Sequence, residues 1–251
     1  MRILLFASKY VGKEILKFIS SHPADELACL VYLENDFDIL EIIESYGLRN
    51  KTKLIPADEI VSSSDALYTL NIDLVVIAWW PFIIDSKLLN VARLGAINTH
   101  NSFLPYGRGV HANFWAIRRG EEYGVSIHIA NQRIDAGPIL AQTKVPYSWE
   151  DDGYTVYWRG LNALVELFKK IYPSIEWYIE RAEPQNLNSG YLKNSSDIAG
   201  EVEIKLDQSY KARDLLNLIR AKQFSESDPC FFICDDARYS VRVEIKRDSN
   251  A

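Results

Sequence analysis

An asparagine and a histidine two residues apart are the first residues in this sequence that could do chemistry together. They lie in the run AINTH, residues 96–100, which reads as a β-strand. A strand directs alternate side chains to one face, so Asn98 and His100 point the same way. The loop NSFLPYGRG follows them. Because ligands of open α/β sheets bind at the carboxyl ends of strands, this pair is placed to contact a ligand.

A carboxylate further along the chain could complete the set. Asp135 lies in the turn-prone stretch NQRIDAGPI, between the apolar runs GVSIHIA and PILAQTKV. An amide can donate a hydrogen bond to a developing oxyanion, an imidazole can move a proton, and a carboxylate can orient that imidazole. Such a set suits acyl transfer to an amine without a covalent nucleophile. Spacing by itself is weak evidence, because a single histidine near a strand end is more often structural.

The segments around these residues predict an α/β sheet with mainly parallel strands. Short apolar runs alternate with amphipathic helix patterns up to AINTH, as in strands joined by crossover helices. Strands are expected at residues 2–7, 27–33, 53–56, 72–79, 96–100, 124–130 and 138–145. Helices are expected at residues 11–22, 37–48, 57–61, 86–95 and 111–120, and a long helix runs from EDDGYT to IEWYIE with a kink before Pro173.

The pattern divides the chain into three parts. Residues 1–182 are expected to form the domain that carries Asn98, His100 and Asp135, and the polar residues 183–200 read as a connector. Residues 201–251 are expected to form a small α/β subdomain, with a strand in EVEIKL, a helix through SYKARDLLNLIRAKQ and strands around CFFIC and YSVRVEIK. Arg220, in this last helix, is expected to be a surface or interface charge.

Composition excludes several classes of function. The formal net charge is -6 and lysines and arginines are dispersed, so nucleic acid is not an expected partner. No apolar run approaches the ~20 residues of a membrane span. The chain enters its first strand without a targeting segment, so we expect a cytoplasmic protein without membrane contact. The turn FASKYVG lacks G-x-G-x-x-G, which disfavours a nicotinamide enzyme.

The three cysteines suggest neither disulfides nor a metal site. Cys29, Cys230 and Cys234 fit a reducing compartment. Cys230 and Cys234 could be half of a metal site, but no nearby cysteine or histidine completes a tetrahedral set. We therefore expect Cys230 and Cys234 to be buried core thiols and not metal ligands.

Two stretches of the sequence resemble a known family. INTHNSFLPYGRGVHANFWAI and GVSIHIANQRIDAGPILAQ resemble the signature of the formyltetrahydrofolate-dependent formyltransferases, an Asn-x-His-x-Ser-x-Leu-Pro run, an Arg-Gly and a later Asp-x-Gly. The resemblance covers residues 72–158 specifically and the α/β half before them more loosely. It implies a Rossmann-like formyltransferase fold for residues 1–182, formyltetrahydrofolate as the formyl donor, and no metal.

The resemblance also implies catalytic roles. Asn98, His100 and Asp135 fall on the family's catalytic asparagine, histidine and aspartate. Asn98 would stabilise the tetrahedral oxyanion, and His100 would take a proton from the attacking amine or relay it to the departing folate nitrogen. Asp135 would orient His100 and raise its basicity. His128, in GVSIHIA, would either support this site or be a buried structural histidine.

Binding residues are implied in two sets. The folate would be contacted by Trp80, Phe82, Leu104, Gly109, Ile134 and Gly137. The acceptor would be contacted by Ser8, Lys9, Tyr10, Arg108 and Asn113. Purely structural roles are the alternatives. One of the adjacent Trp79 and Trp80 is expected in the core, Gly137 could simply supply a turn, and Arg108 could form a surface salt bridge.

One motif indicates a subgroup of the family. RGVHANFW is similar to the Arg-Gly-x-x-x-Asn-x-Trp of sugar N-formyltransferases, and LLNLIRAKQF also looks like a run in those enzymes. The resemblance therefore implies a nucleotide-linked aminodeoxysugar as acceptor and an N-formyl sugar for surface-glycan (O-antigen-like) synthesis as product. A homodimer through the C-terminal appendage is compatible with it. The nucleotide (dTDP, GDP or UDP), the sugar and the amine position stay open.

Other members of the family are alternatives. Methionyl-transfer-RNA formyltransferases carry a larger C-terminal barrel and need basic surface, whereas this chain is acidic and only residues 201–251 follow its connector. Glycinamide-ribonucleotide enzymes usually lack an RGVHANFW-like run. A formyltetrahydrofolate hydrolase usually carries a domain ahead of the catalytic one, and here Met1 leads directly into the first strand. An inactive binding module would not need Asn98, His100 and Asp135 together.

Overall fold

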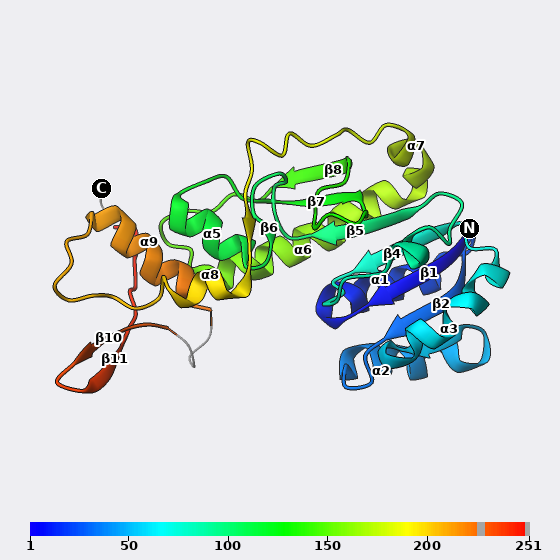
Figure 1. Cartoon of the computed structure of the whole chain (residues 1–251), viewed down its shortest axis with the longest axis horizontal. Helices are drawn as coiled ribbons and strands as arrows, with labels where there is room; N and C mark the ends of the chain where they lie inside the picture. The colour runs from blue at the N-terminus through cyan, green and yellow to red at the C-terminus, as the bar shows by residue number, and fades with distance from the viewer. Residues whose placement is uncertain (225–228, 249–251) are drawn as a thin grey trace. The chain divides into compact units, whose positions relative to one another are not determined.

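The protein is built around a seven-stranded sheet (Figure 1). The computed structural model describes residues 1–224 and 229–248. The strand order is β3-β2-β1-β4-β5-β7-β8. These strands are β1 (Arg2–Ala7), β2 (Glu26–Tyr32), β3 (Lys53–Pro56), β4 (Leu74–Ala78), β5 (Ala96–His100), β7 (Gly124–Ile129) and β8 (Ile139–Lys144). The predicted α/β fold with a mainly parallel sheet is confirmed.

The pairing of the strands places polar residues of β5 next to β7. From β3 to β5 the paired strands are parallel, whereas β5 and β7 are antiparallel. All five residues of β4 are buried, as expected for a parallel sheet covered on both faces. In the antiparallel pair, Asn98 lies opposite His128 and His100 lies opposite Ser126. The register therefore brings a second histidine beside the two polar residues of β5.

The helices between the strands follow the predicted periodicity in most places. They are α1 (Lys9–Ser21), α2 (Phe37–Ser45), α3 (Ile60–Leu67), α4 (Ser86–Leu89), α6 (Gly153–Ile171) and α7 (Ile175–Glu180), with the 3-10 turns η1 (Leu48–Asn50), η2 (Ala57–Glu59), η3 (Tyr68–Leu70) and η4 (Tyr172–Ser174). The turn η4 interrupts the long helix at Pro173, as predicted. Among residues 1–224 and 229–248, no helix combines the length and apolar character that a membrane span needs.

Two helix predictions are wrong in extent. The helix expected over residues 86–95 ends at Leu89, because the N–H groups of Arg93 and Leu94 donate to carbonyls just before β4 and not to the preceding helical turn. The helix expected over residues 57–61 begins as the turn η2 and continues as α3 to Leu67, whose side chain is buried. Both differences come from tertiary contacts, which local periodicity does not contain.

The remaining elements lie in the central loops and towards the C-terminus. They are β6 (Arg108–Gly109), α5 (Ala112–Arg119), β9 (Leu192–Lys193), α8 (Ser195–Ala199), α9 (Ala212–Lys222), β10 (Cys230–Cys234) and β11 (Ala237–Val241). The antiparallel pair β10–β11, red in Figure 1, confirms the small C-terminal appendage. The strand expected in EVEIKL is reduced to one bridge between Glu203 and Phe231. Within the predicted connector, β9 pairs with β6 and α8 follows.

Two compact units are formed, each from separate stretches of chain. Unit 1 comprises residues Met1–His100, Ser126–Gln142 and Leu161–Gln185. Unit 2 comprises Asn101–Val125, Thr143–Gly160 and the described residues from Asn186 onward. The domain boundaries at residues 182 and 200 stay a prediction.

Two expectations for single residues of the C-terminal part are wrong. Arg220 is only 5% exposed, because aromatic rings and backbone carbonyls of unit 2 surround its guanidinium group. Cys234 is partly exposed, because it is the last residue of β10, at the turn of the hairpin. Cys230 is buried, as predicted, and Cys29 is buried as well.

Candidate active site

Strand β5 ends with the two polar residues that the sequence singled out. The first two residues of β5 are buried, whereas Asn98 and His100 are partly exposed. Thr99 points to the opposite face, where its Oγ1 donates to the Ile77 carbonyl of β4 at 3.2 Å. The alternation along the strand therefore presents the amide and the imidazole together at one end of the sheet.

Asp135 comes to the same place from the turn between β7 and β8. Its Oδ1 lies 3.3 Å from Asn98 Nδ2, and its Oδ2 lies 3.5 Å from His100 Nδ1. The side chains of His100 and Asp135 are 11% and 12% exposed. The structure thus brings together the three residues whose catalytic roles the sequence predicts, and those roles stay predictions.

His128 belongs to the same group. It is buried on β7, and its Nδ1 lies 2.8 Å from the Ile129 carbonyl oxygen, which can only accept. In the neutral ring this contact places the proton on Nδ1, so Nε2 accepts from Asn98 Nδ2 at 3.2 Å. The Nε2 atom also lies 3.5 Å from Asp135 Oδ1. The strand alternation in GVSIHIA indicated which face of the strand His128 shares, but not which residue lies opposite it.

These four side chains, Asn98, His100, His128 and Asp135, form what we call the Asn98 cluster. It contains an amide donor, a carboxylate and two imidazoles within one face of unit 1. The contacts of 3.2 to 3.5 Å are longer than the ~2.9 Å of an ordinary N–H···O bond. Catalytic hydrogen bonds are often long without substrate and shorten when it binds. The cluster is therefore suited to proton transfer and to stabilising developing negative charge.

Gln185 is a residue of this region that sequence reasoning missed. Its Nε2 donates to the carbonyls of Asp135 and Gly137, at 3.0 and 2.6 Å. It lies in the polar segment that was predicted to be a connector, where no local pattern marks it. Gly137 has a separate reason to be glycine, since a Cβ atom there would lie 1.9 Å from the Ile129 carbonyl oxygen.

Aromatic residues follow β4 at the carboxyl edge of the sheet. Trp80 packs edge-on against Phe6 of the core and against Phe82, with ring centroids 5.5 and 5.9 Å apart. Phe82 is 60% exposed and lines a pocket of about 510 Å³. The other lining residues follow β2 and β3: Leu33, Glu34, Asn35, Ala57 and Asp58. Ile134 is also exposed, so Phe82 and Ile134 are accessible for the predicted folate contacts.

Three predicted acceptor-binding residues of unit 1 lie at the start of α1. Ser8 is buried, and its Oγ donates to Asp36 Oδ2 at 2.9 Å. The Lys9 N–H donates to the same oxygen at 2.6 Å, and Lys9 has a φ of 55°. The Tyr10 hydroxyl donates to Asn162 Oδ1 at 2.5 Å. Ser8 and the Lys9 backbone therefore serve the turn itself, and of the three only the Lys9 and Tyr10 side chains extend from it.

The other predicted binding residues belong to unit 2. Leu104 and Asn113 are buried, and Asn113 Nδ2 donates to the Gly153 carbonyl at 3.0 Å. A Cβ atom at Gly109 would lie 2.2 Å from the Lys193 carbonyl oxygen, so the pairing of β6 with β9 requires glycine there. The Nε atom of Arg108 is buried and has no hydrogen-bond partner within residues 1–224 and 229–248.

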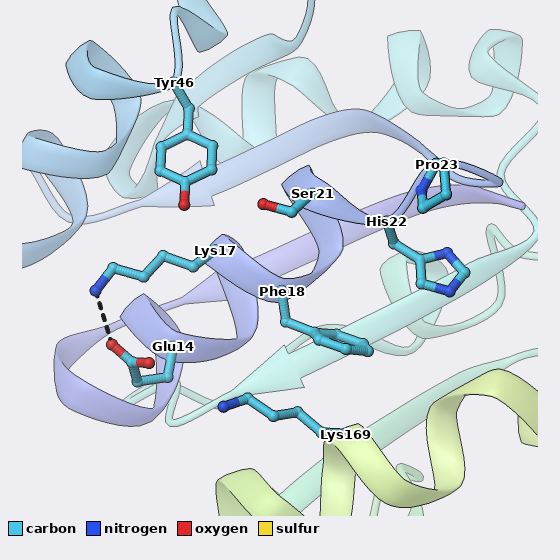
Figure 2. Close-up of a pocket in the computed structure, with 8 residues that line it drawn as sticks. All are labelled: Glu14, Lys17, Phe18, Ser21, His22, Pro23, Tyr46 and Lys169. Atoms are coloured by element: carbon cyan, nitrogen blue, oxygen red, sulfur yellow. Dashed lines mark hydrogen bonds and ion pairs between the residues drawn. The ribbon is translucent and has the colours of Figure 1, made fainter.

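A separate pocket of unit 1 lies along α1 and contains none of the predicted site residues (Figure 2). Its volume is about 370 Å³. It is lined by Glu14, Lys17, Phe18, Ser21, His22, Pro23, Tyr46 and Lys169. Lys17 Nζ is paired with Glu14 at 2.9 Å, and the Phe18 ring packs edge-on against Tyr172. This pocket is away from the carboxyl ends of the strands, and the Asn98 cluster remains the candidate active site.

Comparison with known proteins identifies the family. Residues 20–171 match the formyl transferase family, and residues 197–247 match an N-formyltransferase dimerization C-terminal domain. The first match covers more than half of the chain and includes the whole Asn98 cluster. The protein therefore belongs to the formyl transferase family.

Solved structures with the same fold include sugar-modifying enzymes. A sugar N-formyltransferase from a Shewanella species is 22% identical with a TM-score of 0.77, over 99% of this chain and 100% of that chain. An N-formyltransferase from Helicobacter canadensis, solved with folinic acid and dTDP-3-aminofucose, is 22% identical with a TM-score of 0.67, over 88% of this chain and 80% of its own. At these identities the likeness establishes the fold alone.

Sequence relatives include another branch of the family. Methionyl-tRNA formyltransferase from Staphylococcus epidermidis is 34% identical over 157 residues, which are 62% of this chain and 50% of that protein. The chain spans about half the length of the curated relatives it matches. These relatives leave the acceptor open.

Proposed function

We propose that the protein transfers a formyl group from formyltetrahydrofolate to the amine of a nucleotide-linked aminodeoxysugar. The observation that carries the proposal is the Asn98 cluster at the end of β5, in which an amide, a carboxylate and an imidazole meet within 3.5 Å. Membership of the formyl transferase family supports the transferred group. The folate-derived ligand of the Helicobacter canadensis structure supports the donor.

Asn98, His100 and Asp135 each have a separate role in the proposed reaction. The acceptor amine attacks the formyl carbon, so a C–N bond forms and the carbonyl oxygen becomes an oxyanion. Asn98 Nδ2 donates to that oxyanion, for which it must shift from one of its long contacts with His128 and Asp135. His100 accepts the proton from the amine, and the adjacent Asp135 carboxylate stabilises the resulting imidazolium.

Collapse of the tetrahedral intermediate completes the transfer. The bond between the formyl carbon and the folate nitrogen breaks, and its electron pair stays on that nitrogen. The His100 imidazolium returns its proton there, which yields tetrahydrofolate and an N-formyl amine. No residue of the Asn98 cluster is consumed, so the step needs no covalent enzyme intermediate.

A likeness that covers nearly the whole chain supports the acceptor class. The chain is similar to a sugar N-formyltransferase over 99% of its length, whereas its similarity to a methionyl-tRNA formyltransferase covers 62%. The match of residues 197–247 to a dimerization domain supports a homodimer.

A formyltransferase acting on methionyl-tRNA is the second candidate, because the 34% identical relative carries that activity in its name.

Release of tetrahydrofolate tests the proposal. Purified protein is given formyltetrahydrofolate with dTDP-, GDP- or UDP-linked aminosugars, with methionyl-tRNA, with glycinamide ribonucleotide, or with no acceptor. We expect release only with an aminosugar. Release that depends on methionyl-tRNA or glycinamide ribonucleotide would replace the proposed acceptor, and release without acceptor would indicate a hydrolase.

A further inference from the structure

The turn that carries Asp135 is held from two sides. Asp135 has a φ of 46°, in the left-handed region that costs a non-glycine residue free energy but that aspartate adopts more readily than most residues. On one side, the Pro138 carbonyl accepts from the Ile129 N–H of β7 at 2.8 Å. On the other side, Gln185 Nε2 donates to the carbonyls of Asp135 and Gly137, at 3.0 and 2.6 Å. Gln185 is the side chain that closes this turn.

Gln185 is itself anchored to the sheet. Two residues before it, Glu183 exchanges both backbone hydrogen bonds with Ile139 of β8, at 2.7 and 2.9 Å, in an antiparallel bridge. The Gln185 side chain therefore reaches the turn, 50 residues away in sequence, from a fixed backbone. A side chain anchored in this way can hold an unfavourable backbone conformation in place.

The contact needs a side-chain group with two N–H donors. A single primary amide nitrogen supplies two N–H donors, one for each carbonyl of the turn. A glutamate would turn a carboxylate oxygen towards two carbonyl oxygens, and a leucine would fill the space without donating. Among the described residues, Gln185 Oε1 is buried without a hydrogen-bond partner. An unpaired buried oxygen destabilises a fold, so stability alone does not account for a glutamine at this position.

We propose that Gln185 is a positioning residue, which holds the Asp135 turn so that the carboxylate meets His100 and Asn98. The inference rests on the formyl transfer proposed above. Gln185 touches neither reacting group in this account, and it acts only through the backbone of Asp135 and Gly137. Its loss should therefore lower kcat more than it alters acceptor binding.

Steady-state kinetics give the first test. In Gln185→Leu and Gln185→Glu, we expect kcat to fall about 10- to 100-fold, because a shift of ~1 Å in a positioned group has effects of this size. The KM for the acceptor should stay within about threefold, whereas the KM for the donor can also change, because Ile134 and Gly137 of the same turn are predicted folate contacts. If Gln185→Leu does not fold, Gln185→Glu, which keeps the side-chain length, carries the test. An unchanged kcat in a folded variant contradicts the proposal.

NMR of the His100 ring gives a second test that needs no activity. The ring signals respond to a charged group nearby, so a displaced Asp135 carboxylate should shift them. The ring protons are compared at one fixed pH, with His100→Ala to assign them, in wild type and in both Gln185 variants. Because this comparison works in the free protein, it separates failure of the positioning role from failure of the proposed formyl transfer. Unchanged His100 ring signals overturn the inference.

A matched control distinguishes positioning from general stability. Gln223 Oε1 accepts from the Val243 N–H at 2.6 Å, in unit 2, so Gln223→Leu also removes a hydrogen bond of a partly buried glutamine. We expect Gln223→Leu to lower the thermal midpoint and to leave kcat and the His100 ring signals unchanged. If both glutamine variants lose stability and neither changes kcat, Gln185 has only a structural role.

Discussion

The Asn98 cluster of unit 1 and the surroundings of Arg220 in unit 2 are both polar groups inside a fold, but they are built differently. Arg220 Nη1 donates to the carbonyls of Ser148 and Asp151 at 2.6 and 3.0 Å, and the guanidinium carbon lies 4.7 Å from the centroid of the Trp149 ring. In the Asn98 cluster, the contacts of Asn98 Nδ2 with His128 and Asp135 are 3.2 and 3.3 Å long.

Exposure differs for part of the cluster. Arg220 and His128 are 5% and 2% exposed, whereas the side chains of His100 and Asp135 are 11% and 12% exposed. Short contacts around a covered guanidinium group satisfy its donors within the protein. A ligand can reach the partly exposed His100 and Asp135, whereas Arg220 is covered. A structural polar cluster and a reactive one therefore differ here in how far a ligand can reach their charged groups.

Removal of the catalytic groups should have the largest effect. In His100→Ala, Asn98→Ala and Asp135→Asn, we expect kcat for formyl transfer to fall by about 10² to 10⁴, with thermal midpoints close to wild type. Tetrahydrofolate release measures the rate. His22→Ala, at the pocket in Figure 2, is the matched histidine control and should keep full activity. A His100→Ala variant with at least a third of wild-type activity would remove His100 from the mechanism.

Loss of the Arg220 contacts should lower the stability of the fold and leave ligand binding unchanged. Arg220→Met keeps an apolar side chain beside Trp149 but leaves the Ser148 and Asp151 carbonyls unpaired. We expect the free energy of unfolding to fall by about 2 to 4 kcal/mol, measured by urea denaturation at fixed protein concentration. Binding of folinic acid to the folded variant should be unchanged. A loss below about 0.5 kcal/mol would show that the short contacts are not stabilising.

Substitution of His128 tests the supporting part of the Asn98 cluster. His128→Phe removes the atom that accepts from Asn98 Nδ2, so the amide should lose its fixed orientation and kcat should fall about tenfold. His128→Gln retains an acceptor and should lose less. The ratio of the two kcat values is the measurement. Equal losses in both variants would mean that packing, and not acceptance of a hydrogen bond, is what His128 supplies.

Thiol labelling should give the smallest effect. Burial raises the pKa of the Cys29 thiol to about 12, so its reactive thiolate is scarce at neutral pH and increases only as the pH approaches that value. Cys234 is partly exposed on the hairpin of unit 2. We expect iodoacetamide at pH 8 to label Cys234 in the native protein, with formyl transfer unchanged, as peptide mass spectrometry would show. Labelling of Cys29 before Cys234 would contradict this assignment.

The sequence predicted the parts of the site that depend on local pattern. Alternation along AINTH was sufficient to place Asn98 and His100 on one face, because a strand has a fixed period. The contact of Asp135 with both depends on a turn with a positive φ, which residue spacing does not contain. For the same reason, the antiparallel register that brings His128 to Asn98 could not be read from the chain.

The sequence could not predict the positions of residues whose contacts come from distant segments. Gln185 reaches back 50 residues from a polar segment without periodicity, and so it was included in a connector. Arg220 looked like a surface charge on an amphipathic helix, because the aromatic residues that cover it come from positions 147 and 149. Sequence patterns predict the helices and strands. The burial of a charged side chain depends on which distant segments pack around it.

The most direct test of the central claim follows the formyl carbon itself. Wild-type protein and His100→Ala are incubated with formyltetrahydrofolate labelled with ¹³C in the formyl group and with nucleotide-linked aminosugars, and the sugar products are weighed by mass spectrometry. We predict that wild type gives an aminosugar carrying one labelled formyl group and that His100→Ala gives almost none. Labelled formate in place of a labelled sugar, or equal product from both proteins, would contradict the assignment of the Asn98 cluster as a formyl-transfer site.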